Sequence, residues 1–371
     1  MYYEYIQRIE KIEAVLRWGL PEDPDTSWLD RTFSDLGSPL SQDLVGSLTQ
    51  PGWDLINRGG KRWRPLLMTL ICESLGGGDG ALPLTPLVEF SHNASLIHDD
   101  IEDNSDERRG QPAIHIRYGI DTAINGGSFL YFLSLACINA WDASVERKNQ
   151  VFIRWGEHLR RLHLGQAMDI HWHRDFSSLP SLEEYDGMCR LKTGCLARLA
   201  AVLGVIAALA VLETVSPDKS SRLSKNEEFL IKTLGRAAEK LGVGFQILDD
   251  VKNLTTGNPG KKRGDDVVEG KKSLPVLLYL HRQTDGGALV ARCFSAARAG
   301  GTAAPEVEEL IGELTAAGVL QEAENQGQAL ITEARDLFSG MAPEGFPVCG
   351  EARNALAGLV DLMRGEQGLM Y

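Results

Sequence analysis

Apolar residues recur at spacings of three and four along most of this chain, and no other feature constrains its fold as strongly. The pattern runs through residues 4–18, 227–251 and 306–338. Alternating strand patterns flanked by Asn-Gly or Asp-Gly turns are absent, and long β-branched runs are rare. The sequence therefore predicts an all-α fold of roughly ten or more helices.

Segments rich in Gly, Pro and small polar residues separate the periodic stretches. They are 21–40, 76–84, 213–227, 254–264, 283–305 and 339–350. None is long or biased enough to form an interdomain linker, and no internal repeat is visible. We expect one all-α domain over residues 1–371. Residues 1–50 form an N-terminal extension whose role stays open.

The longest apolar run, Leu199–Leu212, has 14 residues. A membrane-crossing helix needs roughly 20, so we interpret the run as a core helix and predict no transmembrane segment. The N-terminus mixes acidic and basic residues, unlike a signal peptide. Six cysteines are scattered singly, as is typical of a reducing compartment. We expect a cytoplasmic protein.

The net charge of −13 argues against nucleic acid as a partner, because an acidic chain repels phosphate backbones at long range. An anionic ligand would then need local cations or metal ions.

The first chemical signal is the acidic stretch DDIEDNSDERRG at 99–110. On a helix, Asp99 and Asp103 share a face, and Asp100 lies three residues before Asp103. Like charges at this spacing repel each other, so something cationic must offset them. Arg108 and Arg109 follow directly, and guanidinium groups suit phosphate oxygens.

A second acidic cluster occurs about 150 residues later. Asp249, Asp250 and Asn253 repeat the offsets of the first cluster after an apolar stretch. Two such faces suggest facing helices that hold hard cations between them. Oxygen ligands without His or Cys favour Mg²⁺, which is usually shared with substrate phosphates. The implied ligand is a diphosphate.

Basic residues accompany these clusters. The segment GGKRWRP supplies Lys61, Arg62 and Arg64 around a Gly-Gly turn. Further cations follow at Lys192, Lys262 and Lys271. Each alone is typical of a surface residue, but together they match the needs of two diphosphate groups.

Six motifs of this chain resemble, in sequence and in order, those of the trans-isoprenyl diphosphate synthases, the polyprenyl synthetase family. They are GGKRWRP, DDIED with RRG, LGQAMD, KTG, FQILDDVKN and GDDVVEGKKSLP. The resemblance covers about residues 56–280 and is closest to eukaryotic-type geranylgeranyl diphosphate synthases. Asn253 departs from the family's usual third aspartate but is shared by that subgroup. Ser128 stands where many relatives have Asp after Gly127.

The resemblance implies helices around a deep central cavity, usually in a homodimer. It implies head-to-tail condensation of an allylic diphosphate with isopentenyl diphosphate, with three Mg²⁺ per site held by Asp99, Asp100, Asp103, Asp249, Asp250 and Asn253. By the same correspondence, Arg108, Lys192 and Lys262 would contact the allylic diphosphate, with Lys271 as a further cation. Isopentenyl diphosphate would be held by Lys61, Arg64, His92 and Arg109. Thr193 and Gln246 would lie near the developing cation, and Gln166 and Asp169 would support the metal site.

The helix that carries Asp99 also bears on the length of the product. At a rise of 1.5 Å per residue, Ala94 lies about 7 Å and Ser91 about 12 Å deeper than Asp99. Ala94 and Ser95 are small, so the cavity should pass the C15 stage. The aromatic residues of the next helix, Phe129, Tyr131 and Phe132, are candidates for a floor at C20, although ordinary core packing explains them equally well. We predict that Ala94→Phe shortens the product.

Three alternatives stay open: a synthase of longer or shorter products, a terpene cyclase, and a non-catalytic subunit that binds prenyl diphosphate. A cyclase needs no second diphosphate site, which the GGKRWRP segment with Arg109 would supply. Silent subunits typically lose metal aspartates, which this chain keeps. His171 and His173 point apart on a helix, so we assign them surface or packing roles.

Overall fold

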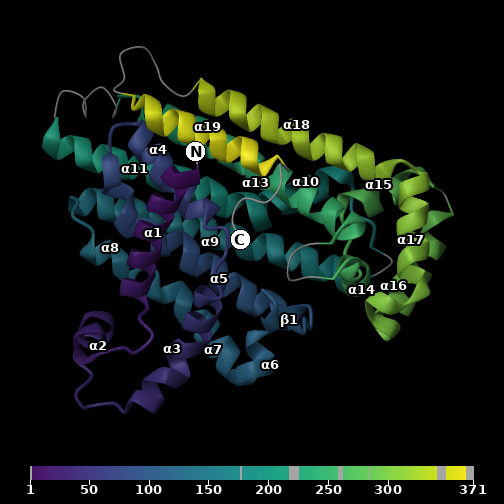
Figure 1. The fold of residues 1–371 in the computed structure, drawn as a ribbon, viewed down its shortest axis with the longest axis horizontal. Helices are drawn as coiled ribbons and strands as arrows, with labels where there is room; N and C mark the ends of the chain where they lie inside the picture. The colour runs from purple at the N-terminus through teal and green to yellow at the C-terminus, as the bar shows by residue number, and fades with distance from the viewer. Residues whose placement is uncertain are drawn as a thin grey trace.

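The computed structural model describes residues 2–175, 178–216, 225–257, 262–283, 285–340 and 348–364. Over these residues the chain is almost entirely helical (Figure 1), which confirms the predicted all-α fold. The two strands, β1 (Glu107–Arg108) and β2 (Gln111–Pro112), pair antiparallel in a short hairpin directly after the first acidic cluster.

The helices follow one another in this order: α1 (Tyr2–Gly19), α2 (Thr26–Phe33), α3 (Gln42–Asn57), α4 (Trp63–Ser74), η1 (Gly78–Leu84), α5 (Thr85–Glu102), α6 (Ile114–Tyr118), α7 (Ile120–Leu133), α8 (Ala136–Ala140), α9 (Val145–Arg174), α10 (Leu182–Cys189), η2 (Arg190–Gly194) and α11 (Cys195–Val215). After the segment 217–224, they continue with α13 (Glu227–Thr255), α14 (Asp265–Glu269), α15 (Leu274–Arg282), α16 (Gly286–Gly300), η3 (Gly301–Ala303), α17 (Pro305–Ala316), α18 (Val319–Ser339) and α19 (Gly350–Met363).

The apolar helix α11 lies at the centre of the fold, where α4, α9 and α13 pack around it. Leu199–Leu212 is buried throughout except for the half-buried Val211. By length and composition alone, Leu182–Val215 and Ile120–Ala140 could cross a membrane. The apolar window of the first is 89% buried inside the protein, and burial by neighbouring helices is what an apolar core helix requires. The core-helix prediction is confirmed.

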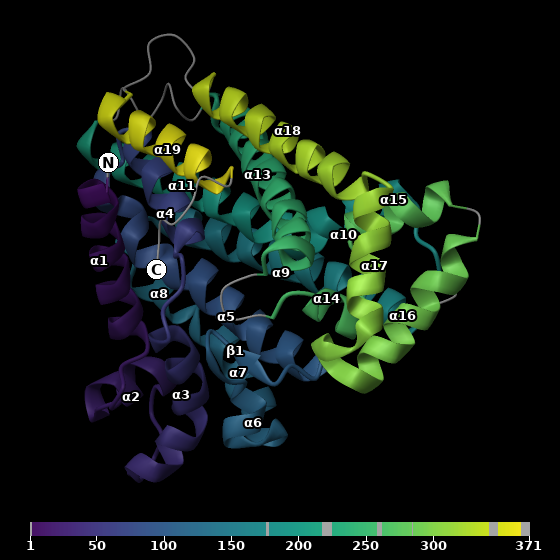
Figure 2. The same cartoon turned by 45° about the vertical axis from the view of Figure 1, so that its right-hand side comes forward.

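Two hydrophobic clusters support the bundle. The larger involves α1, α4, α5, α7, α9, α11 and part of α13, and the smaller fills the space between the end of α13 and α14–α18. Figures 1 and 2 show α18 lying along the outside of α13, with α15–α17 at one end of the molecule. α18 thus covers one side of α13, and the smaller cluster packs the end of α13 against α14–α18. The single-domain organisation stays a prediction.

Some segments differ from the sequence expectations. The breaker segment 283–305 contains the helix α16, because its Ala, Val, Cys and Phe residues bury one face while its glycines are confined to the ends. The periodic stretch 306–338 divides into α17 and α18 at Gly318, whose φ of +71° ends the first helix in a left-handed turn.

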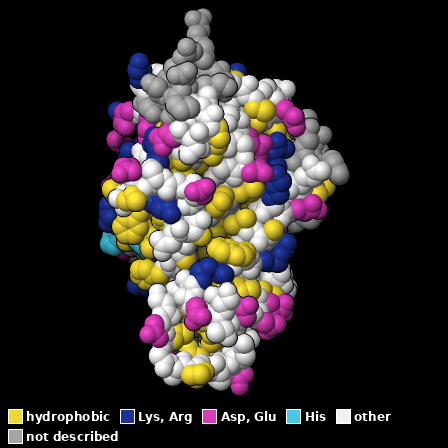
Figure 3. Space-filling model, turned by 90° about the vertical axis from the view of Figure 1, so that its left-hand side faces the viewer, with side chains coloured by type: hydrophobic (Ala, Val, Ile, Leu, Met, Phe, Trp, Pro, Cys, Tyr) yellow, Lys and Arg dark blue, Asp and Glu magenta, His cyan; other side chains and the backbone are white. Residues whose placement is uncertain are grey.

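The N-terminal extension is a packed part of the bundle. Ile12 and Leu16 of α1 and Trp28 of α2 are buried in the larger cluster. The face that carries this end of the fold is drawn in Figure 3, where hydrophobic side chains lie between Lys/Arg and Asp/Glu side chains. The extension therefore contributes to the core, and α1 also reaches the cavity described next.

Candidate active site

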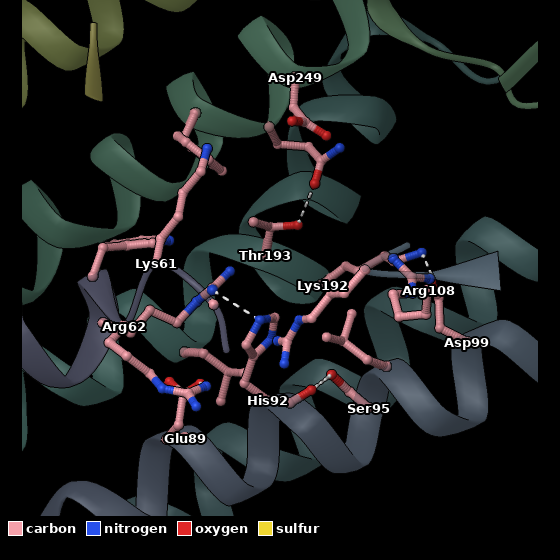
Figure 4. A pocket seen from close by; sticks show the side chains of 18 of the residues that line it. Lys61, Arg62, Glu89, His92, Ser95, Asp99, Arg108, Lys192, Thr193 and Asp249 are labelled. Atoms are coloured by element: carbon pink, nitrogen blue, oxygen red, sulfur yellow. Dashed lines mark hydrogen bonds and ion pairs between the residues drawn. The ribbon is translucent and has the colours of Figure 1, made fainter. Parts of the chain in front are cut away.

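One cavity of about 1040 Å³ brings the predicted motifs together. Its wall is formed by α5, α9, η2 and α13, with the segment 58–64 at one end. Figure 4 shows Asp99 on one side of the cavity and Asp249 on the other, with Lys192 and Thr193 between them. The two acidic helices therefore face a shared hollow, as the sequence pattern predicted.

On α5, the helical repeat separates the three aspartates of the first motif. Asp99 and Asp103 line the cavity, since residues four apart share a face. Asp100 is turned away from the cavity and fully buried, where its Oδ1 accepts hydrogen bonds from Arg108. Arg108 also lies 3.5 Å from Asp99. We interpret Asp100 as the anchor of Arg108, in place of the predicted metal ligand.

On α13, Asp249 and Asp250 line the cavity but have different surroundings. Asp250 is buried and accepts from Lys271 at 2.7 Å, Gln246 at 2.7 Å and Tyr185 at 3.2 Å. Asn253 does not line the cavity; its Oδ1 accepts the backbone N–H of Asp266 at 3.2 Å, at the start of α14. Asp249 is therefore the residue of this motif that is best placed to meet a ligand.

Lys192 links the two sides of the cavity from a π-helical turn, η2, that interrupts the helical run from α10 to α11. Such turns are frequent at functional sites. Its ammonium donates to Asp169 at 2.5 Å and to Asp99 at 3.2 Å. The close approach of η2 to α9 requires Gly165, where a Cβ would lie 2.3 Å from the Lys192 backbone nitrogen.

His173 lies in the same group of charges, contrary to the surface or packing role expected from sequence. It lines the cavity, 2.9 Å from Asp169 and 3.9 Å from Asp103. Burial acts against protonation, but Asp169 and Asp103 raise the pKa of His173 to about 9. The sequence spacing could have indicated this position for His173. Gln166, Asp169 and His173 are separated by three and four residues and so share one face of α9.

At the end of the cavity that carries the aspartates, acidic and basic side chains stabilise each other's charged forms. Burial opposes ionisation of Lys192 and Lys271, yet the surrounding aspartates raise the pKa of each. Burial likewise opposes ionisation of Asp169, but Lys192 and His173 lower its pKa. Burial and the neighbouring Asp99 raise the pKa of Asp103. An added cation would relieve this repulsion between Asp99 and Asp103.

The other end of the cavity is rich in cations. Lys61, Arg64, His92 and Arg109 line it together, and Arg64 Nη1 lies 3.3 Å from His92 Nε2. Burial lowers the pKa of Arg64 and of Arg109 to about 10 in each case. Burial and these arginines hold the pKa of His92 well below its ordinary value, so the ring is neutral at pH 7. An anion bound here would offset the crowded positive charge.

Of the other predicted residues, some line the cavity and one does not. Thr193 donates to Gln246 Oε1 at 3.0 Å, and Gln166 donates to Asp99 at 3.0 Å. Lys262 is exposed and does not line the cavity. It follows the segment 258–261, which lies outside the described residues.

Among the predicted chain-length residues, Ser95 lines the cavity, while Ala94 and Ser91 are buried behind the wall. Phe129 does not line it and stacks on Phe33, with ring centroids 5.7 Å apart. Phe132 is 69% exposed on the outer face of α7. In this structure, neither phenylalanine forms the predicted floor. The apolar lining on α9 and α11 comes from Leu162 and Leu196.

The donor set suits a hard divalent cation that is shared with a ligand. In the described part of the chain, no group of three or more His, Cys, Asp or Glu side chains could hold a metal ion alone. Magnesium is usually bound by one or two carboxylates together with substrate phosphates. Asp99, Asp103 and Asp249 around a common hollow fit this kind of binding.

Comparison with known proteins agrees with this geometry. The family model described as polyprenyl synthetase matches residues 45–311. A geranylfarnesyl diphosphate synthase of Aeropyrum pernix is 31% identical over 294 residues, 77% of this chain and 85% of that protein. A geranylgeranyl pyrophosphate synthase of Rhodocybe pseudopiperita is 35% identical over 62% of this chain and 61% of its own length. The crystal structure of the geranylgeranyl pyrophosphate synthetase from Pyrococcus horikoshii has a TM-score of 0.77, covering 99% of this chain and 98% of that one at 24% identity.

The fold and the site define a helical prenyltransferase. The chain belongs to the polyprenyl synthetase family. The family and enzyme class predicted from the motifs are therefore confirmed.

Proposed function

We propose that this protein condenses an allylic diphosphate with isopentenyl diphosphate and that its product is geranylgeranyl diphosphate. The observation that carries the proposal is the division of one cavity into two unlike ends. One end pairs its cations with aspartates, while the other gathers Lys61, Arg64 and Arg109 around a neutral histidine. Two diphosphates can therefore bind in the same cavity, one at the aspartate end and the other at the cationic end.

The allylic diphosphate would bind at the aspartate end. Three Mg²⁺ ions, the number that the family resemblance implies, would be held by Asp99, Asp103 and Asp249 and would neutralise the negative charge that grows on the leaving diphosphate. Lys192 and Arg108, already within 3.5 Å of Asp99, would move their charge from the aspartates to the diphosphate oxygens. Enzymes of this family are generally magnesium-dependent.

Isopentenyl diphosphate would bind at the cationic end without a metal. Neutral His92 can still donate or accept a hydrogen bond, and the arginines supply forked donors for phosphate oxygens. The carbon chain would then point toward the allylic carbon. After bond formation a proton must leave, and the departing diphosphate would accept it. Lys192 and His173 are held in their protonated forms by aspartates, and the positive charge around His92 opposes protonation of that neutral ring.

The developing allylic cation needs water-free walls and oriented dipoles. The Thr193 hydroxyl and the Gln246 amide are held together at 3.0 Å beside Asp249, and Leu162 and Leu196 continue the wall below them. A C20 product agrees with the geranylgeranyl pyrophosphate synthases among the relatives. Synthesis of longer or shorter chains would leave the catalytic end unchanged and alter only this apolar part.

A terpene cyclase is disfavoured by the second cation group, which cyclisation does not use. A silent subunit is disfavoured by the three aspartates that still face the cavity. We also place the protein in a reducing compartment, the cytoplasm, because five of its six free cysteines are buried and unpaired.

We further propose a homodimer through the outer faces of α7 and α9. A groove lies beside Trp155 on α9, and the two helices expose the following large apolar residues: Ile120, Ile124, Phe132, Phe152 and Ile153. Such a patch on a protein surface marks an interaction site, and a second copy would cover it with the same patch. Sedimentation equilibrium should give a dimer for the wild type and a monomer for Phe152→Asp.

One assay tests the proposed function. The purified protein is incubated with Mg²⁺, labelled isopentenyl diphosphate and either the C5, C10 or C15 allylic primer, and the dephosphorylated alcohols are sized. We expect a C20 alcohol with at least one primer and none for Asp99→Ala. Cyclised hydrocarbons would favour a cyclase, and no incorporation with any primer would contradict the proposal.

A further inference from the structure

Arg62 follows Lys61 directly and also lines the cavity, but its guanidinium bonds to other parts of the protein. Its guanidinium is buried and bonded at every nitrogen: Nε donates to Glu13 at 2.6 Å, Nη1 to Glu89 at 2.7 Å and Nη2 to the Ile56 carbonyl at 2.6 Å. The sequence grouped Arg62 with the phosphate-binding cations. Because three of its five N–H donors, one on each nitrogen, already bond to protein oxygens, its main role is to hold this cluster together.

The cluster fixes a turn that the backbone would not favour alone. Gly59, Gly60 and Arg62 have φ values of +84°, +146° and +46°. A left-handed conformation is unfavourable for a residue with a Cβ, so Arg62 needs its side-chain anchors to stay there. A Cβ on Gly60 would lie 3.1 Å from Arg109 Nη2 and 3.3 Å from Arg62 Nη1. The turn therefore sets the relative positions of Lys61, Arg64 and Arg109.

One anchor of this turn comes from the N-terminal helix. Glu13 lies on α1, outside the matched residues 45–311. The same helix brings Tyr5, Ile6 and Ile9 to the cavity wall, and the Tyr5 hydroxyl donates to the Ala355 carbonyl of α19 at 2.5 Å. Figure 2 shows α1 running down one side of the bundle from the end where α19 lies. Leu362 of α19 lines the cavity as well, so α1 and α19 both border it.

We propose that Glu13 is a positioning residue for the isopentenyl diphosphate site: acting through Arg62, it holds the turn that presents Lys61 and Arg64 to the metal-free diphosphate. This inference rests on the proposed function and assigns the N-terminal helix a role in binding one of the two substrates. Lys61 is close enough to Asp249 for their charges to interact, but Asp99 is held by Lys192 and Arg108, which are not part of this turn. The two substrates should therefore respond differently when the anchor is lost.

The test is steady-state kinetics with each substrate varied in turn. For Glu13→Gln we expect the KM for isopentenyl diphosphate to rise about tenfold, equivalent to 1.4 kcal/mol of binding, with the allylic KM and kcat within about twofold of wild type. Glu13→Asp keeps the charge and should give an intermediate KM. Arg62→Lys loses the forked donors and should show the same split. The control is Glu10→Gln, an exposed residue one turn earlier on α1, which should behave as wild type.

The outcomes separate the two proposals. An unchanged KM for isopentenyl diphosphate in Glu13→Gln and Arg62→Lys would overturn the positioning role. A parallel rise of both KM values with a lower melting temperature would also overturn it, because that result indicates a merely structural contact. No turnover by the wild type would instead be a failure of the proposed function.

Discussion

The indole N–H of Trp155 on α9 donates to the hydroxyl of Ser91 on α5 at 3.2 Å, and both residues are buried. Ser91 lies one turn deeper than the cavity-lining Ser95, and Trp155 lies two turns deeper than the lining Leu162. The two helices are therefore joined outside the cavity lining, one turn beyond Ser95, where a chain that grows between α5 and α9 would have to stop.

Truncating Trp155 should lengthen the product. Trp155→Ala removes the indole and opens space below Ser95, so we expect products longer than C20 when the dephosphorylated alcohols are separated by chromatography. Arg154→Gln, which alters a surface ion pair with Glu157 on the same helix, is the control. An unchanged product ladder in Trp155→Ala would place the floor elsewhere.

Adding bulk to α5 should have the opposite effect. Ser95 lines the cavity, so Ser95→Phe places an aromatic ring directly in the path of the chain, and we expect products of C15 or shorter. Ala94 is fully buried behind the wall, so Ala94→Phe should shorten the product while also costing about 1–3 kcal/mol of folding stability through overpacking. Chromatography and thermal unfolding measure the two effects. A full-length product from Ser95→Phe would refute this assignment of the wall.

Asp250 and Lys271 should behave as a buried ion pair. Asp250→Asn removes the negative charge that offsets the buried ammonium of Lys271. We therefore expect the free energy of unfolding to fall by roughly 3–5 kcal/mol. The double variant Asp250→Leu with Lys271→Met removes both charges and should recover most of that stability without recovering activity. Denaturant titration measures the free energy of unfolding of each variant. If the loss in the double variant equals the sum of the losses in the two single variants, the two charges are not coupled.

His158 should make stability depend on pH. Burial lowers its pKa from about 6.5 to about 4, and the ring is held by the Arg154 carbonyl at 2.7 Å. Between pH 4 and 6.5 the unfolded chain binds the extra proton, so the stability from this group is present above pH 6.5 and is lost as the pH falls toward 4. The full loss is on the order of 3 kcal/mol.

The variant His158→Leu should remove this component. Its free energy of unfolding should fall less than that of the wild type when the pH is lowered from 7 to 4, and the difference between the two proteins should be constant above pH 7. Equal slopes for both proteins would contradict the assignment.

Helical spacing predicted much of the site. The four-residue spacing predicts that Asp99 and Asp103 share one face, and the repeated offsets at Asp249 predict a facing helix. What spacing does not give is the direction of neighbouring residues relative to the cavity. Asp100 and Asn253 carry suitable oxygens, but neither lines the cavity. Asp100 lies on another side of α5 and accepts from Arg108, while Asn253, although four residues after Asp249, is buried against the start of α14.

The remaining differences come from packing between distant segments. Phe132 is as hydrophobic as a core residue, so its residue type does not predict exposure. It faces outward because α7 packs against the protein through its other face. Arg62 resembles its cationic neighbours in sequence, and only the placement of α1 and α5 brings Glu13 and Glu89 to it. His173 could have been found, since it follows Asp169 by four residues on the same helix face.

The central claim is that aspartates on α5 and α13 jointly bind one diphosphate through magnesium. Calorimetric titration with an allylic thiolodiphosphate, which resists ionisation, tests it directly in wild type, Asp99→Asn and Asp249→Asn. We predict tight binding by the wild type only when Mg²⁺ is present, and at least a hundredfold weaker binding by each variant, about 2.7 kcal/mol. Tight binding without Mg²⁺, or full affinity after loss of either carboxylate, would contradict the account.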